Sequence, residues 1–159
     1  MTNFAKIALS AAALAVAAPA VAGESPIVVQ SGAQMEKWSS RATNELNRKL
    51  EQAEWSNGVS KPGIVQLGFS VGEDGRAKDV TVLRSSGHAR TDTNAILAVS
   101  QMDSLGDAPV FDVKGRDFRA NIVFARNEVQ KQQFFAELSR SERARLARGG
   151  GASTIVIGS

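Results

Sequence analysis

A run of alternating residues in the middle of the chain places the tightest constraint on its fold. From Gly63 to Val71, apolar residues alternate with polar or small ones, and the alternation returns at Val80 and Val82. A period of two indicates strands with one buried face. Between the two runs, Gly72-Glu73-Asp74-Gly75 supplies residues that tolerate the positive φ of a short connection. The stretch therefore predicts a β-hairpin, followed by an exit turn at Ser85-Ser86-Gly87.

Two helices and a third strand are predicted around this hairpin. Apolar residues at spacings of three and four indicate a helix before it; they are Met35, Trp38, Ala42, Leu46, Leu50 and Ala53. A second helix is expected from about His88 to Met102. Its buried residues should be Ala95, Ile96, Val99 and Met102. The third strand is indicated by one more alternating apolar set, Phe118, Ala120, Ile122 and Phe124.

The order helix, strand, strand, helix, strand over residues 35–125 predicts the fold class. It is a two-layer α+β domain with a three-stranded antiparallel sheet and helices on one face. The opposite face of the sheet is expected to meet water; it carries Gln66, Ser70, Thr81, Arg119 and Asn121. Residues 23–34, with Pro26 and Gly32, are expected to form an extended arm.

The first 22 residues have the composition of a secretory signal peptide. Lys6 lies in a basic region, Ile7 to Ala18 is apolar, and Ala20-Val21-Ala22 is a small-residue cleavage site. Cleavage and a periplasmic location are expected; the alternative is an uncleaved membrane anchor, for which the apolar run is short. Without Lys6, 18 basic and 16 acidic residues leave a net charge of +2. Such a charge does not call for a nucleic-acid partner.

Residues 126–148 are predicted to form a basic amphipathic helix after the domain. Six basic and three acidic residues give this segment a net charge of +3. One interpretation is contact with a membrane surface, and the other is an exposed helix that docks through Phe134 and Phe135. Residues 149–159 are interpreted as a glycine hinge and an extended tail that contains Ile155-Val156-Ile157.

The residue types that support catalysis or metal binding are scarce. The chain has no cysteine, and His88 is its only histidine, so no metal or other cofactor is expected. Ser85 and Ser86 lie near His88, but nothing in the sequence marks an acid that would orient the base. The serines are better explained as a turn and helix entry. We therefore expect a protein that is not an enzyme.

The segment from Trp38 to Ala125 resembles the periplasmic C-terminal domain of the TonB family. The resemblance is carried by the strand pattern from Gly63 to Val71, the hairpin, the exit turn, the helix after it and the last strand. The motif residues beyond the first strand are Asp74-Gly75-Arg76, Val80-Thr81-Val82, Ser85-Ser86-Gly87-His88, Asp92 and the strand from Phe118 to Phe124. The chain lacks the Tyr-Pro segment common before the first strand, and has Thr91 and Thr93-Asn94 around the helical aspartate.

This resemblance implies a binding module that pairs its last strand with an extended segment of an outer-membrane transporter. The binding strand would comprise Phe118, Arg119, Ala120, Asn121, Ile122, Val123, Phe124 and Ala125. A Pro-rich spacer is not expected, because the chain has four prolines, and a membrane anchor is not expected, because the apolar run is short. The alternative is an envelope-structural or cell-wall-binding protein. Ser25 to Val29 and Ser153 to Ser159 look like the partner's box segment. Either could pair with the last strand in the same chain or in a neighbour, or be an ordinary terminal segment.

Overall fold

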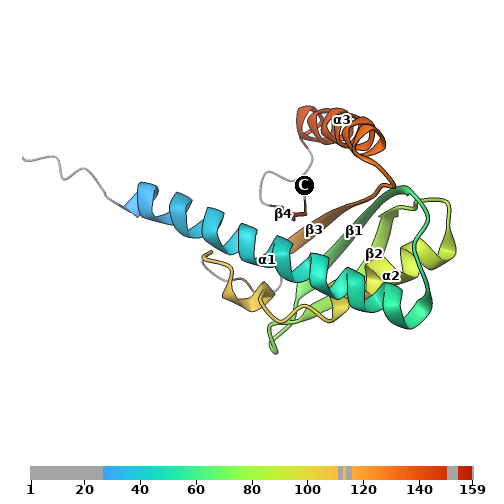
Figure 1. Cartoon of the computed structure of the whole chain (residues 1–159). Helices are drawn as coiled ribbons and strands as arrows, with labels where there is room; N and C mark the ends of the chain where they lie inside the picture. The colour runs from blue at the N-terminus through green and yellow to red at the C-terminus, as the bar shows by residue number, and fades with distance from the viewer. Residues whose placement is uncertain (1–26, 111–112, 114–115, 150–153, 159) are drawn as a thin grey trace, which may run out of the picture.

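The structure is a computed structural model that describes residues 27–110, 113, 116–149 and 154–158. The predicted signal peptide lies outside the described residues. Figure 1 shows a sheet between helices, with one long helix running across it. In chain order the elements are α1 (Ile27–Asn57), β1 (Gly63–Val71), β2 (Ala77–Arg84), α2 (Ala89–Ser100), the short 3₁₀ helix η1 (Leu105–Asp107), β3 (Asp117–Phe124), α3 (Glu128–Ala147) and β4 (Ile155–Ile157).

The sheet has four strands in the order β2-β1-β3-β4. β1 pairs antiparallel with both β2 and β3, whereas β4 pairs parallel with β3. The class α+β is confirmed, but the prediction of three antiparallel strands is wrong, because the sheet is four-stranded and mixed. The reason is the crossover: α3 carries the chain back along β3, so the next strand must run parallel to it.

The apolar face of the sheet packs against α1 and α2, as the helical stripe predicted. Trp38, Ala42 and Leu46 of α1 are buried in the same core as Ala95 and Val99 of α2. The indole Nε1 of Trp38 donates a hydrogen bond of 2.8 Å to the carbonyl of Ser104. Two further core positions, Thr91 and Asn94, are polar. They bind the connector before β1 through Lys61 N to Thr91 Oγ1, Thr91 Oγ1 to the Lys61 carbonyl, and Asn94 Nδ2 to the Gly58 carbonyl.

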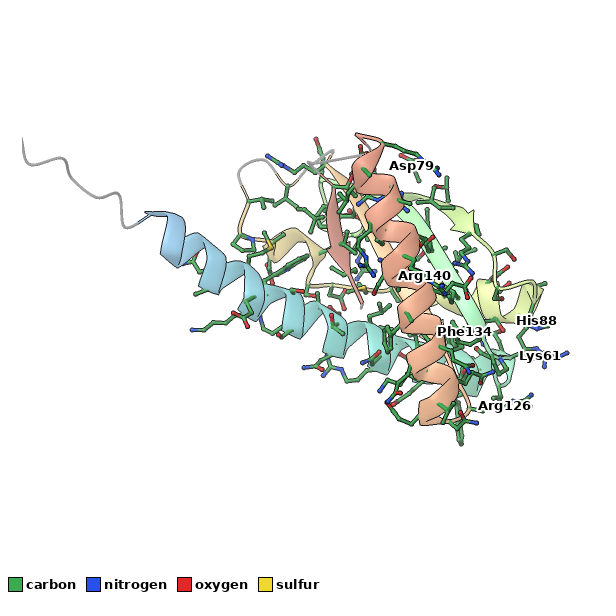
Figure 2. All side chains as sticks on the ribbon, turned by 90° about the horizontal axis from the view of Figure 1, so that it is seen from above. Lys61, Asp79, His88, Arg126, Phe134 and Arg140 are labelled. Carbon is green, nitrogen blue, oxygen red and sulfur yellow. The ribbon has the colours of Figure 1, made fainter. Side chains whose placement is uncertain are left out.

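α3 covers part of the second face of the sheet, which was expected to meet water, whereas Thr81 on that face is exposed as expected. Figure 2 shows α3 lying across the strands. Gln66 and Asn121 are buried there, and Gln66 Nε2 donates to Asn121 Oδ1 at 2.9 Å and to Glu142 Oε1 at 2.8 Å. Arg84 of β2 forms an ion pair with Glu137 of α3. The molecule therefore has three layers. The contact between the sheet and α3 is polar, because the sheet residues that face α3 are polar.

Two local predictions differ from the structure. The chain is already helical from Ile27, so the residues from Ile27 to Gln34 are not the predicted extended arm. From Ile27 to Asn57 the chain contains no proline that would interrupt the helical hydrogen bonds. Val82 was expected in the core but is 43% exposed. The cause is its place on an edge strand with irregular register on both sides of it.

Candidate functional site

The predicted binding strand is β3, and one of its two long edges is fully used. β3 pairs with β1 at every position from Asp117, opposite Ser70, to Phe124, opposite Gly63. Its other edge pairs with β4 only at Phe118, Arg119 and Ala120. A guest strand therefore has access only to the β4 side of β3.

The eight predicted site residues have different environments along this strand. Phe118, Ala120 and Ile122 are buried in the core, and Phe124 is half-buried against it. Arg119 and Asn121 lie on the face covered by α3, where Arg119 Nη1 is 3.4 Å from Glu142 Oε1. Val123 is half-buried and Ala125 is exposed. The predicted site residues thus lie together at and just after β3. Because most of their side chains are buried or half-buried, a guest would bind mainly to their backbone groups.

The opposite edge of the sheet, β2, is poorly suited to accept a strand. Its register against β1 shifts between Gln66 and Leu67 and again between Gly68 and Ser70. In both places β2 contains one extra residue, and Asp79 near the second has a φ of 54°. Irregularities of this kind twist an edge and interrupt its ladder of backbone groups. Of the two edges, the one at β3 and β4 is the better candidate for strand addition.

The exit turn after β2 is built around Asp92, one turn into α2. Asp92 Oδ1 accepts hydrogen bonds from Ser86 N at 2.9 Å and Ser86 Oγ at 2.7 Å, and Oδ2 accepts one from Ser85 Oγ at 2.5 Å. Partial burial raises the pKa of Asp92, but the bonds from Ser85 and Ser86 outweigh it and hold the pKa below 3.8. Both hydroxyls are thus engaged in the turn, as the interpretation of Ser-Ser-Gly as a turn and helix entry predicted.

Replacing Asp92 with alanine should lower the free energy of unfolding by about 1 to 2 kcal/mol, because two hydroxyls and one amide lose a charged acceptor. Thr93→Ala is a matched control, because Thr93 is exposed in the same turn of α2. Urea unfolding monitored by circular dichroism measures both. Equal stability of the two variants would contradict the role of Asp92.

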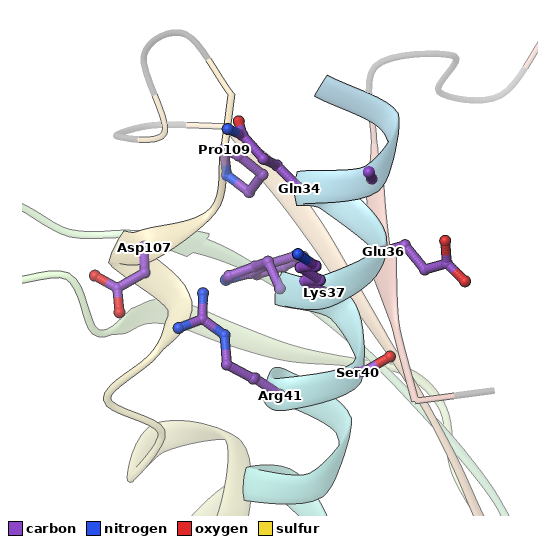
Figure 3. A pocket seen from close by; sticks show the side chains of 9 residues that line it. Gln34, Glu36, Lys37, Ser40, Arg41, Asp107 and Pro109 are labelled. Atoms are coloured by element: carbon purple, nitrogen blue, oxygen red, sulfur yellow. The ribbon is translucent and has the colours of Figure 1, made fainter. Parts of the chain in front are cut away.

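A broad hollow of about 870 Å³ lies between the first half of α1 and the loop after η1, and no residue of β3 or β4 lines it. Figure 3 shows Arg41 directed from α1 toward the side of Asp107, whereas Glu36 points away. Sequence reasoning did not find it, since its two walls are about seventy residues apart and neither carries a motif. In the described part of the chain, no group of three or more acidic or histidine side chains could hold a metal ion. Nor is any described helix long and apolar enough to cross a membrane.

Comparison with known proteins gives one match. Residues 60–125 match the family described as the Gram-negative bacterial TonB protein C-terminal. These residues run from the connector before β1 to the end of β3, and they contain the hairpin, the exit turn and the candidate edge. The chain matches no curated protein and no solved structure. α3 and β4 lie outside the matched residues.

Proposed function

Residues 60–125 of this chain form a TonB C-terminal-like domain, which is a protein-interaction module, and we propose that it binds an extended segment of an outer-membrane transporter along the free edge of β3. The mode is β-augmentation, in which unpaired backbone groups of an edge strand bind the guest and neighbouring side chains select it. Domains of this family act in the periplasm. We propose the same location for this protein, with residues 1–22 removed on export.

One observation carries this proposal: the outer edge of β3 already accepts an extended segment. Ile155, Val156 and Ile157 lie parallel to β3, opposite Phe118, Arg119 and Ala120. The edge is therefore competent for strand addition. It is also the better edge, because the irregular register of β2 disfavours pairing on the opposite side of the sheet.

Contact of α3 with a membrane surface is less well supported. The helix directs Leu138 into a buried position and uses Glu137 and Glu142 in contacts with the sheet. Arg145 Nε lies 2.8 Å from Glu142 Oε2, so part of the basic charge of α3 is neutralised within the helix. The observed docking favours the interpretation of α3 as a helix packed on its own domain.

We also propose that the domain does no chemistry. Ser85 and Ser86 both donate to Asp92, and a hydroxyl engaged with a carboxylate inside a tight turn is a structural group rather than an activated nucleophile. An envelope-structural role remains the alternative function, and the two differ in the identity of the partner.

Site-specific crosslinking in living cells tests the proposal. A photoreactive residue at Val123 should form an adduct with an outer-membrane protein, because Val123 lies on β3 beyond its last pair with β4 and lines a hollow of about 450 Å³. The matched control is Val82 on the opposite edge strand, which is also accessible. An adduct with a cell-wall component or a non-transporter would favour the envelope-structural role. Identical adducts from Val123 and Val82, or none from Val123, would contradict binding at β3.

A further inference from the structure

The segment that already lies on the candidate edge belongs to the chain itself. We propose that β4 is a displaceable, built-in occupant of the edge at Phe118–Ala120. We infer further that a guest taking the place of β4 needs glycine directly after the pattern aliphatic, any residue, aliphatic. This inference rests on the proposed function and adds a glycine requirement and a regulatory step.

β4 covers only the first half of the edge. β3 has eight residues, and the pairs with β4 end at Ala120. Within the described part of the chain, no strand lies beside Asn121–Phe124 on that side. This uncovered half of the edge therefore stays accessible while β4 is in place.

The aliphatic positions of the pattern follow from the face that β4 turns toward α1. Ile157 lies opposite Ala120 and is 1% exposed. The small side chain of Ala120 leaves space that the larger Ile157 fills within the core. Ile155, opposite Phe118, is partly buried against the same core. Because side chains alternate along a strand, a guest in this register places its own first and third residues there.

The middle position is permissive. Val156 lies opposite Arg119, on the other face of the sheet, and is half-exposed. A polar residue there would keep access to water, and an acidic one would face a guanidinium. The site therefore selects a guest mainly through the two guest residues on either side of this middle position.

The requirement for glycine comes from Gly158, directly after β4. Its φ is +73°, a conformation that side chains rarely allow. A Cβ atom at this position would lie 2.8 Å from the Asn121 carbonyl oxygen and 3.1 Å from Leu46 Cδ2. The chain thus passes too close to β3 and α1 for any larger residue.

β4 is displaceable because it is short, and its attachment to the same chain makes it a competitor of the guest. Three residue pairs hold it, and strands this short depend on few contacts. It follows α3 through a segment that begins Gly149-Gly150-Gly151. A strand of the same chain competes with a free guest at an effective concentration of about the millimolar range. Releasing the tail should therefore tighten the apparent binding of a guest.

Calorimetric titration of the full-length protein with the peptide Ser-Thr-Ile-Val-Ile-Gly-Ser tests this competition. Ile157→Asp should release the tail and bind the peptide at least about tenfold more tightly than the unaltered protein. Val156→Asp is the matched control: it adds the same charge at the neighbouring position but faces Arg119, so β4 should stay in place. A second peptide with valine instead of glycine should bind Ile157→Asp at least about tenfold more weakly than the first.

Circular dichroism establishes that each variant is folded. If Ile157→Asp is not, Gly158→Val decides the question, because it dislodges the tail through strain and leaves the core residues unchanged. Released variants that bind no more tightly than the unaltered protein, or that do not discriminate between the two peptides, overturn the inference. If a transporter is crosslinked through Val123 but releasing the tail does not change peptide binding, transporter binding at β3 stands and displacement of β4 is overturned. If the released variants bind the peptide as expected but no transporter is crosslinked, displacement of β4 stands and transporter binding is overturned.

Discussion

Replacing Phe69 with alanine is expected to lower the free energy of unfolding by about 3 to 5 kcal/mol. Phe69 is buried on β1 and stacks on Phe118 of β3, with ring centroids 5.5 Å apart. Phe118 in turn packs against the Trp38 ring at an interplanar angle of 66°, with ring centroids 6.2 Å apart. Removing one ring leaves a cavity where β1, β3 and α1 meet. A loss of this size is much of the stability of a small domain.

The matched control is Phe124→Ala, at the other end of β3. Phe124 shares the apolar face with Phe118 but is only half-buried. Its replacement should therefore cost clearly less than that of Phe69. Chemical denaturation followed by Trp fluorescence measures both. Near-unaltered stability of Phe69→Ala would show that the pairing of Phe69 with Phe118 is wrong.

The second large effect is expected at Glu45, a buried carboxylate of α1. It is 7% exposed and accepts hydrogen bonds from Asp103 N at 2.9 Å and Ser104 N at 3.1 Å, together with one from the Ser104 hydroxyl. Glu45→Ala leaves two amides of the segment after α2 without acceptors. The expected cost is about 2 to 4 kcal/mol. Glu51→Ala, an exposed glutamate on the same helix, is the control and should be close to neutral.

The same carboxylate predicts how stability depends on pH. Burial raises the pKa of Glu45, but the hydrogen bonds from Ser104 and Asp103, with the nearby Lys49 charge, outweigh it and hold the pKa below 4.5. The folded state thus favours the charged form. Its stabilisation is fully present above pH 4.5 and is lost as pH falls through the lowered pKa.

Urea unfolding between pH 7 and pH 3 should therefore show a decline in stability on the acid side, and Glu45→Gln should make this decline shallower. Some decline should remain, because the pKa of Asp92 is also lowered in the folded protein. An unchanged acid profile in Glu45→Gln would contradict the role of Glu45.

The crossover from β3 through α3 to β4 brings the end of the chain back to the sheet. α3 contacts the sheet through polar side chains, and β4, which follows α3, pairs with the outer edge of β3. The residues matched to the family end at position 125, just before this crossover. α3 and β4 follow these residues, and β4 occupies part of the outer edge of β3.

Local patterns in the sequence determined the parts of the structure whose residues are close together in the chain. Alternation predicted β1 and β3, the stripe from Met35 to Ala53 predicted the buried side of α1, and Ser-Ser-Gly predicted the exit turn. Each depends on the period of a helix or strand or on turn chemistry, which a short segment carries by itself. The choice of β3 as the candidate binding strand came instead from the resemblance to the TonB family.

Only the tertiary structure decided which surfaces were covered. Gln66 and Asn121 have the polar character of a solvent face, yet α3 buries them, because Glu142 on that helix supplies a partner to Gln66. Glu45 finds its partners 58 and 59 residues away, and Ile157 becomes a core residue only when β4 lies beside β3. A polar or strand-forming residue carries no local record of a distant partner. Its role follows from where the chain returns in space, and the periodicity of its own segment does not encode that return.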